Sequence, residues 1–429
     1  AILDNPEALL VCNGYKDEAF IRLALMSQKL GKRVFIVVEK LDELALIDKV
    51  AKELGVQPNI GLRIKLVSAG QGRWSSSTGE YSKFGLNTME LMEALEIAKS
   101  KNILDCVKLI HFHLGSQITN IRRIKDSLKE VGRFYSELMK FGCNIQYIDV
   151  GGGLGIDYDG SRSTFASSTN YSVQEYANDV VYHLLEICKA EDLPHPNIIS
   201  ESGRAMTAHH SILVVNVLDV TTFPEWSKQI EIADDAPEVV KEVFDVLDST
   251  SNKNLIESWH DAVHLKDEAQ NQFLLGLISL TDRAMAERIY WGICRKIEKL
   301  SSRLKFLPDD IRNLRTKLAD KYFCNFSVFQ SVPDSWAIDQ VFPVVPLNRL
   351  HEEPDRDATI ADITCDSDGR IDTFIGTHRG TENTLRVHSL QPGESSPLCI
   401  FLTGAYQEIL GDLHNLFGDT NTVHVSLKE

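Results

Sequence analysis

Glycine and charged residues follow two neighbouring apolar runs in the first half of the chain. Three glycines occupy positions 151–153, directly after Ile145–Val150, and Glu201, Gly203 and Arg204 follow the next run. Consecutive glycines let backbone N–H groups approach a phosphate closely, although a tight strand-to-helix turn is the alternative interpretation. Glu201 could accept a hydrogen bond from a protonated ring nitrogen, with Gly203 and Arg204 beside a phosphate; the plainer alternative is a structural ion pair between Glu201 and Arg204.

A histidine-rich segment, His111–Gln117, also follows an apolar run. On a strand, residues 111 and 113 point to the same side, so we expect at least one of them to face the barrel lumen or its mouth. A lone histidine is usually a hydrogen-bonded core residue. The Gly115-Ser116 pair that follows His113 makes a ligand contact an equally good interpretation.

A thiol and a carboxylate stand side by side in the second half of the chain, at Cys365 and Asp366. They begin the sequence Cys-Asp-Ser-Asp-Gly, which follows the apolar run Ala358–Thr364. As a catalytic motif they would supply a thiol beside a carboxylate, whereas the closely spaced acceptors could bind calcium or form an Asx-type turn. Taken alone, the pattern favours the turn.

Two histidines, His260 and His264, stand four residues apart on a predicted helix, a spacing that could bind zinc. The metalloprotease motif has glutamate where Asp261 stands, and no third ligand is evident. We therefore interpret the pair as structural and assign no metal ligand from the sequence.

The first 210 residues alternate apolar runs with amphipathic helical patterns. The runs are continuous, which is typical of parallel strands buried on both faces, and the polar signals follow them, as in a TIM-type (β/α)8 barrel. A Rossmann sheet would carry GxGxxG after its first strand, and none is there. The predicted strands are Leu9–Asn13, Arg33–Val38, Ile60–Leu66, Val107–Gly115, Ile145–Gly153 and Asn197–Gly203, and the predicted helices are Asp17–Leu30, Glu43–Leu54, Thr88–Lys99 and Ser127–Lys140.

In the second half of the chain the predicted secondary structure changes twice, first to helices and then to short strands and turns. We predict an α/β protein with three parts: an incomplete TIM-type barrel of about six strands at 1–215, a helical-bundle insert at 225–320, and a mostly β domain at 321–429. The insert is expected to hold helices at Glu238–Leu247, Asn254–Leu265, Asp267–Leu277, Thr281–Leu300 and Asp310–Ala319, and the last part strands at Ala358–Cys365, Arg370–Ile375, Leu398–Thr403 and Val423–Leu427.

Composition narrows the class of partner. The chain of 429 residues has 61 acidic and 45 basic residues and a formal charge of −16, which argues against nucleic acid or an anionic membrane as main partner. No apolar run approaches the ~20 residues that span a bilayer. Eight cysteines are spread without a CxxC pair, which indicates reduced thiols rather than a disulfide framework or a zinc site.

Taken together and in this order, the motifs resemble the fold-type III pyridoxal-phosphate decarboxylases, the alanine racemase and ornithine decarboxylase superfamily. The motif sequences are most similar to those of the biosynthetic, bacterial-type arginine decarboxylases. The resemblance covers nearly the whole chain, including the helical insert. The segments that carry it are Val11–Asp17, His111–Gln117, Ile148–Tyr158, Glu201–His210, Asn325–Pro346, Ile363–Gly369 and Gly404–Thr420.

The resemblance implies a role for each matching residue. His113 would stack on the pyridine ring of pyridoxal 5'-phosphate, and Glu201 would pair with the protonated ring nitrogen. Cys365 would protonate the substrate carbon after CO2 leaves, and Asp366 would help to hold the substrate. In this superfamily both come from the second subunit, so a homodimer with shared active sites is implied. The phosphate would be held by Ser116, Gly151, Gly152, Gly153, Gly203, Arg204 and Tyr406.

Recognition of a guanidinium requires a carboxylate that can accept two parallel N–H bonds. Our candidate is Asp334, with Asp339 behind it; the alternative is that Asp334 is a helix-cap aspartate.

One feature of the family is missing from the sequence. The lysine that binds the cofactor covalently ends the first barrel strand in these enzymes, and neither Lys16 nor Lys83 matches its motif. The chain starts at Ala1 and has six predicted strands where a barrel has about eight. We therefore expect a fragment that lacks the N-terminal strands, the last C-terminal residues and catalytic competence.

The main functional expectation is decarboxylation of L-arginine to agmatine and CO2 in polyamine (spermidine) synthesis, in the cytoplasm. The resemblance also allows a magnesium requirement and an oligomer larger than the dimer. The alternatives are a related decarboxylase of ornithine, lysine, diaminopimelate or carboxynorspermidine, and a non-catalytic binding protein that keeps the cofactor pocket.

Overall fold

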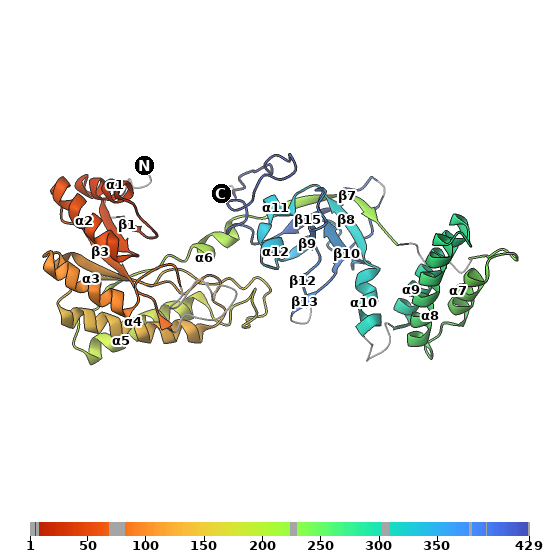
Figure 1. The fold of residues 1–429 in the computed structure, drawn as a ribbon, viewed down its shortest axis with the longest axis horizontal. Coiled ribbons are helices and arrows are strands. Elements are labelled where there is room, and N and C mark those ends of the chain that lie inside the picture. The colour runs from red at the N-terminus through yellow and green to blue at the C-terminus, as the bar shows by residue number, and fades with distance from the viewer. Residues whose placement is uncertain are drawn as a thin grey trace. The chain divides into compact units, whose positions relative to one another are not determined.

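A computed structural model describes residues 5, 8–67, 82–223, 230–301, 309–376, 380–391 and 393–427. The chain forms two compact units (Figure 1). The first comprises Ala1–Ser211 and Leu402–Tyr406, and the second comprises Ile212–Phe401 and Gln407–Glu429.

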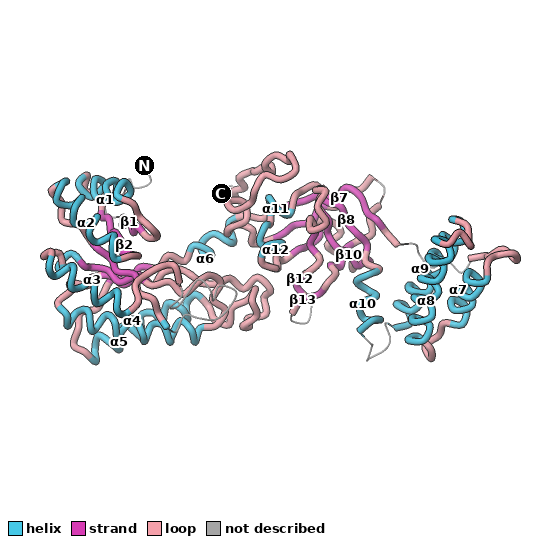
Figure 2. The backbone as a smooth tube through the Cα atoms, viewed as in Figure 1, coloured by secondary structure: helices cyan, strands magenta, loops and turns pink. Residues whose placement is uncertain are grey.

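The first unit is built on a six-stranded sheet whose strands are all parallel and follow one another in chain order (Figure 2). The predicted run of barrel strands is therefore confirmed. Each strand except β2 is shorter than its apolar run, because the last residues of the run belong to the loop that follows the strand. The strands are β1 (Leu9–Cys12), β2 (Arg33–Val38), β3 (Ile60–Arg63), β4 (Val107–His111), β5 (Tyr147–Asp149) and β6 (Asn197–Ile199).

Within the described residues, five long helices connect these strands, as the βα pattern requires. They are α1 (Glu18–Lys29), α2 (Leu41–Leu54), α3 (Thr88–Ser100), α4 (Ile121–Phe141) and α5 (Val173–Ala190). Asn87 and Glu90 form a capping box at the start of α3. Helix α5 was not predicted from the sequence, because its buried residues are confined to a narrow stripe at Val180, Leu184 and Cys188.

The two faces of the sheet bury different residues. In β2, Val34, Ile36 and Val38 belong to the large core shared with the helices. Phe35 and Val37 point to the opposite face, where they form a small cluster with neighbouring strands. Burial on both faces explains why β2 is a continuous apolar run.

The second unit contains a seven-stranded mixed sheet with the order β11-β10-β8-β7-β15-β9, in which β14 pairs with β10. A two-stranded β12–β13 ribbon and two short helices, α11 (Val328–Ser331) and α12 (Pro333–Ala337), accompany it. The strands are β7 (Leu213–Thr221), β8 (Asp320–Cys324), β9 (Val344–Pro346), β10 (Arg356–Ala361), β11 (Arg370–Ile371), β12 (Phe374–Ile375), β13 (Thr381–Glu382), β14 (Leu385–Val387) and β15 (Pro397–Ile400).

Two sequence expectations differ from this sheet. Leu213–Thr221, of which the first residues were assigned to the barrel, is a strand of the second unit. The predicted strand Val423–Leu427 is not a strand. Its valine and leucine side chains are 80–97% exposed, so its alternating pattern buries no face.

Helices dominate the stretch between β7 and β8, as predicted. They are α7 (Glu238–Ser249), α8 (Leu255–Leu274), α9 (Leu280–Ser301) and α10 (Asp309–Lys317). Val243, Trp259, Ile289 and Ile293 lie in their common core. Two helices were expected where the single helix α8 forms, but nothing at Lys266 breaks a helix.

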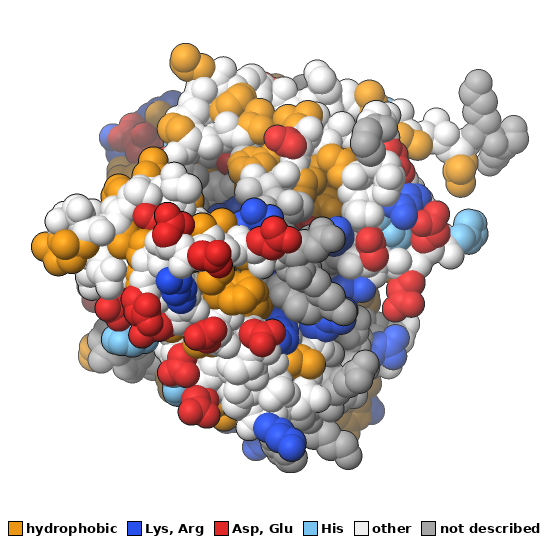
Figure 3. Space-filling view, turned by 90° about the vertical axis from the view of Figure 1, so that its right-hand side faces the viewer, with side chains coloured by type: hydrophobic (Ala, Val, Ile, Leu, Met, Phe, Trp, Pro, Cys, Tyr) orange, Lys and Arg blue, Asp and Glu red, His pale blue; other side chains and the backbone are white. Residues whose placement is uncertain are grey.

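The face shown in Figure 3 carries acidic side chains beside basic and hydrophobic ones, in keeping with the net charge of −16. Among the helices of the described residues, none combines the length and the apolar character that crossing a bilayer requires.

Candidate active site

Loops from three neighbouring strands meet at the carboxyl edge of the first unit's sheet. The Gly152 N–H donates to Nδ1 of His113 at 3.1 Å, which joins the loop after β5 to the loop after β4. The Glu201 N–H donates to the Gly151 carbonyl at 2.9 Å, which joins the loop after β6 to the same triplet. The structure therefore brings His113, the glycine triplet and Glu201 together, as parallel strands require of residues that follow them.

Close backbone approach explains two of the glycines. A Cβ at Gly151 would lie 2.2 Å from the Phe112 carbonyl oxygen, and one at Gly153 would lie 2.5 Å from the Gly115 carbonyl oxygen. Both residues also have left-handed φ angles, +64° and +99°. The N–H groups of Gly151 and Gly152 already have partners within the protein, in Asp149 and His113. A phosphate contact by the triplet therefore stays a prediction, while its packing role is clear.

Arg204 is the centre of a second group of predicted residues. Only 5% of this arginine is exposed. Its Nη2 donates to Oγ of Ser116 at 3.0 Å, its Nη1 donates to the Tyr158 hydroxyl at 2.9 Å, and its guanidinium carbon lies 4.8 Å from the centre of the Tyr406 ring. The structure thus places three of the predicted phosphate-binding residues in direct contact.

This arginine keeps capacity for an anion. Within the described residues, the buried Nε of Arg204 has no hydrogen-bond partner. Gly203, at the start of the short helix α6 (Gly203–Thr207), leaves open space, because a Cβ there would meet only the Tyr406 hydroxyl at 3.9 Å. A positive charge, a free N–H and an open approach suit a phosphate group.

Glu201 is held by residues from two other strand ends. Nδ2 of Asn13 donates to its Oε1, and Nε2 of His111 lies 3.7 Å from the same oxygen. Burial raises the pKa of Glu201, but its interactions with His111 and Asn13 outweigh that effect, so the pKa lies below its usual value. The carboxylate is therefore ionised at neutral pH and able to accept a hydrogen bond from a protonated ring nitrogen.

His113 is neutral at physiological pH. Burial lowers its pKa to about 4, and the positive charge of Arg63 lowers it further. Since Nδ1 accepts the Gly152 N–H, the ring proton lies on Nε2. A neutral imidazole suits the predicted stacking on an aromatic ring, which stays a prediction.

A buried carboxyl beside His111 and Glu201, that of Asp149, was missed from the sequence. His111, Asp149 and Glu201 each offer one ligand atom within 4.8 Å of the others, and Asp149 is fully buried. Burial raises the pKa of Asp149 to about 6. His111 and Asp149 end their strands directly before the motifs that were singled out, and that position was the available signal.

Replacing Asp149 by asparagine tests this buried carboxyl. Because its folded-state pKa of about 6 exceeds the unfolded value of 3.8, the folded chain binds the proton more tightly, and stability falls as pH rises from about 4 through 6. The asparagine side chain has no charge to bury, so we expect Asp149→Asn to gain about 1–3 kcal/mol relative to the parent between pH 4 and pH 8. Urea unfolding at both pH values measures this. An equal difference at both would show that the carboxyl does not titrate between the two states.

The second unit holds the predicted thiol and carboxylate. Cys365 is exposed, whereas the other seven cysteines are buried, and none of the eight is in a disulfide. Nδ2 of Asn415 donates to Sγ of Cys365 at 3.2 Å, and Nε2 of His414 lies 2.5 Å from Oδ2 of Asp366. No role was assigned to His414 or Asn415 from the sequence.

The segment after β10 is a tight turn, as the pattern favoured. Oδ1 of Asp362 accepts from the backbone N–H of Thr364 at 2.9 Å, and the Gly369 N–H donates to the Asp366 carbonyl at 3.0 Å. A Cβ at Gly369 would lie 2.2 Å from Oδ1 of Asp362, so glycine is required there. The turn places Cys365 and Asp366 on the surface of the unit.

Asp334 lies in the first turn of α12, also in the second unit. Its Oδ2 accepts from Nε2 of Gln407 at 2.9 Å, and its own N–H donates to Oε1 of Gln407 at 3.2 Å. The side chain of Gln407 thus fixes this aspartate, and one of its two carboxylate oxygens already has a protein donor.

Lys16, which follows strand β1, is occupied by structural contacts. It is 1% exposed, its Nζ lies 3.2 Å from Oε2 of Glu43, and Nζ also donates to the Gly14 carbonyl at 2.5 Å. Its amine is therefore held in a buried ion pair.

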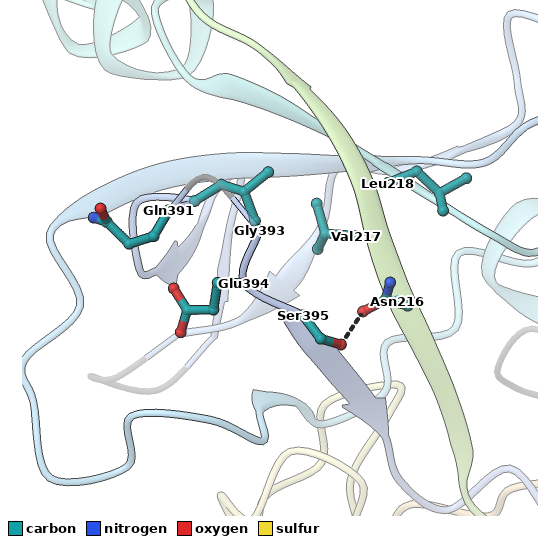
Figure 4. Close-up of a pocket in the computed structure, with 8 residues that line it drawn as sticks. Asn216, Val217, Leu218, Gln391, Gly393, Glu394 and Ser395 are labelled. Atoms are coloured by element: carbon teal, nitrogen blue, oxygen red, sulfur yellow. Dashed lines mark hydrogen bonds between the residues drawn. The ribbon is translucent and has the colours of Figure 1, made fainter.

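An open pocket of about 520 Å³ lies in the second unit and is lined by none of these residues (Figure 4). Oγ of Ser395 donates to Oδ1 of Asn216 at 2.9 Å in its lining. The lining comprises Asn216, Val217 and Leu218 of β7 and Leu390, Gln391, Gly393, Glu394 and Ser395. Among the described residues that line it, Glu394 is the ionisable one.

Two family models match parts of this chain. Residues 1–208 match the pyridoxal binding domain of pyridoxal-dependent decarboxylases, and residues 233–315 match the arginine decarboxylase helical bundle domain. A biosynthetic arginine decarboxylase of Bacteroides thetaiotaomicron is 56% identical over 430 residues, which cover 100% of this chain and 68% of that relative. The chain belongs to the biosynthetic arginine decarboxylase family.

Further relatives agree with this membership. A biosynthetic arginine decarboxylase of Phocaeicola vulgatus is 53% identical and is covered to 68% of its length. The crystal structure of that of Campylobacter jejuni is 37% identical with a TM-score of 0.81, covering 96% of this chain and 65% of that one. The chain thus spans about two thirds of the length of its relatives. Members of the family are pyridoxal-dependent decarboxylases, as the resemblance implied.

Proposed function

We propose that the protein decarboxylates L-arginine to agmatine and CO2 with pyridoxal 5'-phosphate, and that agmatine serves polyamine synthesis in the cytoplasm. The observation that carries the proposal is the pair of residues that follow β6 at the carboxyl edge of the six-stranded sheet. Glu201 is ionised there, and Arg204 keeps a buried N–H that could bind an anion. Family membership supports the substrate, because the relatives are named arginine decarboxylases.

The residues at this edge fit the cofactor. Arg204, Ser116 and Tyr406 would hold the phosphate with Gly203 and the glycine triplet, and the free Nε of Arg204 supports this assignment. Glu201 would keep a proton on the ring nitrogen, and neutral His113 would lie against the ring. When bound, pyridoxal phosphate supplies the electron sink for the electrons that CO2 leaves behind. The family also allows magnesium, to which we assign no residue of this chain.

The second unit would supply the proton and hold the substrate. Cys365 would donate its proton to the substrate carbon that has lost CO2, and Asp366 would bind the substrate. As in the superfamily, both would act in the active site of the partner subunit of a homodimer, which could assemble further. Sedimentation of the intact gene product with and without cofactor tests the dimer.

We also propose that Lys16 and Lys83 are not the covalent anchor of the cofactor, and that these 429 residues alone do not turn over arginine. The buried ion pair of Lys16 with Glu43 supports the first statement. Borohydride reduction of the chain with pyridoxal phosphate should give no pyridoxyl-lysine peptide at either position. A reduced adduct at Lys16 would contradict the proposal.

The experiment that tests the function is CO2 release by the intact gene product. With added pyridoxal phosphate we expect equimolar CO2 and agmatine from arginine. Faster release from ornithine, lysine, diaminopimelate or carboxynorspermidine would favour the related decarboxylases. Cofactor binding without release from any of them would favour a non-catalytic binding protein.

Asp334 is our proposed guanidinium acceptor. Because a carboxylate on a guanidinium contributes charge-assisted hydrogen bonds, we expect Asp334→Ala to raise KM for arginine about 10–100-fold with a smaller change for ornithine. The kinetics of both substrates measure this. Asp245→Ala, at an exposed position of α7, is the matched control. An equal rise for both substrates would remove Asp334 from specificity and leave it as a helix-end residue bonded to Gln407.

A further inference from the structure

We propose that Asn415 and His414 are positioning residues for Cys365 and Asp366: Asn415 orients the thiol and stabilises it as it ionises, and His414 fixes the carboxylate. The inference rests on the proposed function, in which Cys365 is the proton donor. It assigns roles to two residues that have none in the sequence analysis, although both lie in the matching segment Gly404–Thr420.

The contacts join residues that are about fifty positions apart in the chain. Nδ2 of Asn415 donates to Sγ of Cys365 and to Oδ2 of Asp366, each at 3.2 Å. Nε2 of His414 lies 2.5 Å from the same Asp366 oxygen. One amide group therefore bridges the thiol and the carboxylate, and the imidazole approaches the carboxylate from the same segment.

This segment is anchored on α11. The ring of His414 lies 4.6 Å, centre to centre, from that of Phe329, and Nε2 of Gln330 donates to the Gly418 carbonyl at 2.9 Å. A Cβ at Gly411 would lie 1.9 Å from the Gln330 carbonyl oxygen, so the backbone is in close contact there. These contacts hold the segment at a defined distance from the Cys365 turn.

The bridge suits the chemistry of a proton donor. When Cys365 gives its proton to the substrate carbon, a C–H bond forms and the S–H electron pair stays on sulfur as a thiolate. The adjacent Asp366 carboxylate opposes this second negative charge. An N–H from Asn415 aimed at Sγ stabilises the charge where it develops, and it does so without reorganisation.

His414 fixes the carboxylate that lies beside the thiol. Its hydrogen bond lowers the pKa of Asp366, together with a smaller contribution from Asn415, so the carboxylate stays ionised and paired. The remaining charged groups of the turn are Asp362, Asp368 and Arg370. Asp362 accepts from the N–H groups of Val328 and Thr364, and Arg370 is engaged with Asp372 at 2.8 Å and with the Ser367 carbonyl at 3.4 Å, so these groups are unchanged when Asn415 or His414 is replaced.

The backbone of Asn415 decides which variants are useful. Its φ is +53°, in the left-handed region that asparagine, aspartate and glycine tolerate. Asn415→Asp keeps the shape and replaces the donor by a charged acceptor, and Asn415→Gly removes the side chain without backbone strain. Asn102, with φ +57° in the first unit, offers both substitutions as matched controls.

The experiment is the rate of iodoacetamide alkylation of Cys365 between pH 6 and pH 10, measured on the 429-residue chain by mass spectrometry. The selectivity comes from exposure, since the other seven cysteines are buried. We expect Asn415→Asp to slow alkylation at pH 7 about 10-fold and to move the midpoint up by about one pH unit. Asn415→Gly should slow it about 3-fold, and the controls Asn102→Asp and Asn102→Gly should match the parent chain.

A pH profile for Asn415→Asp and Asn415→Gly that coincides with that of the parent chain would overturn the inference. If either variant loses its far-ultraviolet circular dichroism, His414→Gln replaces it, with an upward midpoint shift expected and an unchanged midpoint contradicting the role. The assay uses neither cofactor nor arginine. A shifted profile, combined with an intact gene product that releases no CO2, would therefore leave the effect of Asn415 on the thiol standing and remove the proposed function.

Discussion

Replacing Cys365 by alanine is expected to lower kcat for CO2-coupled agmatine formation by about 10²–10⁴-fold, the range that a positioned general acid contributes. The thiol is exposed on a fixed turn and contacts Asn415, so the loss is chemical and not a loss of packing. KM for arginine should change little, because Cys365 is not assigned to substrate binding. Steady-state kinetics of the intact gene product measure both constants.

Ser367→Ala is the control for this prediction, because Ser367 is exposed in the same turn. It should leave kcat within about 3-fold of the parent. A Cys365→Ala variant with a normal kcat and a normal agmatine yield would mean that another group donates the proton.

Replacing Arg204 by lysine is expected to weaken the binding of pyridoxamine 5'-phosphate to this chain by at least about 100-fold. Lysine keeps the charge but loses the planar fork that now contacts Ser116, Tyr158 and the Tyr406 ring. Charge-assisted bonds to a phosphate contribute about 1.5–3 kcal/mol each, so the loss of one or two accounts for this factor. The amine form of the cofactor is used because it requires no lysine attachment.

Equilibrium dialysis of the ligand measures this affinity, and thermal unfolding of each variant checks that it is folded. Arg133→Lys, on the exposed surface of α4, is the matched control and should bind like the parent chain. Tyr406→Phe keeps the ring over Arg204 and removes the hydroxyl, and we expect a loss of about 3–10-fold. Unchanged binding in Arg204→Lys would place the phosphate elsewhere.

The strands were predictable where burial alone decides them. Arg33–Val38 is apolar after its first residue because both of its faces are covered, and its predicted bounds equal those of β2. The prediction of a strand at Val423–Leu427 was wrong because an alternation of apolar and polar residues also occurs in an exposed segment. Periodicity reports which residues could be buried together, and it does not report whether a partner covers them.

The site was predictable where the residues follow strands. Glu201, Arg204 and Gly151 stand at strand ends, and parallel topology alone brings such positions together. His414 and Asn415 were missed because they stand about fifty residues after Cys365 in the sequence. They lie beside it only because their loop packs on α11. Asp149 was missed because the sequence does not distinguish a buried carboxyl at the end of a strand from an exposed one in the following turn.

The central claim is that the carboxyl edge of the six-stranded sheet holds the cofactor. The measurement that tests it most directly is a crystal structure of this chain with pyridoxamine 5'-phosphate. We expect electron density for the phosphate against Arg204 and Ser116, with the ring nitrogen within hydrogen-bonding distance of Glu201. Density for the ligand at another place, with the edge of the sheet empty, would contradict the claim.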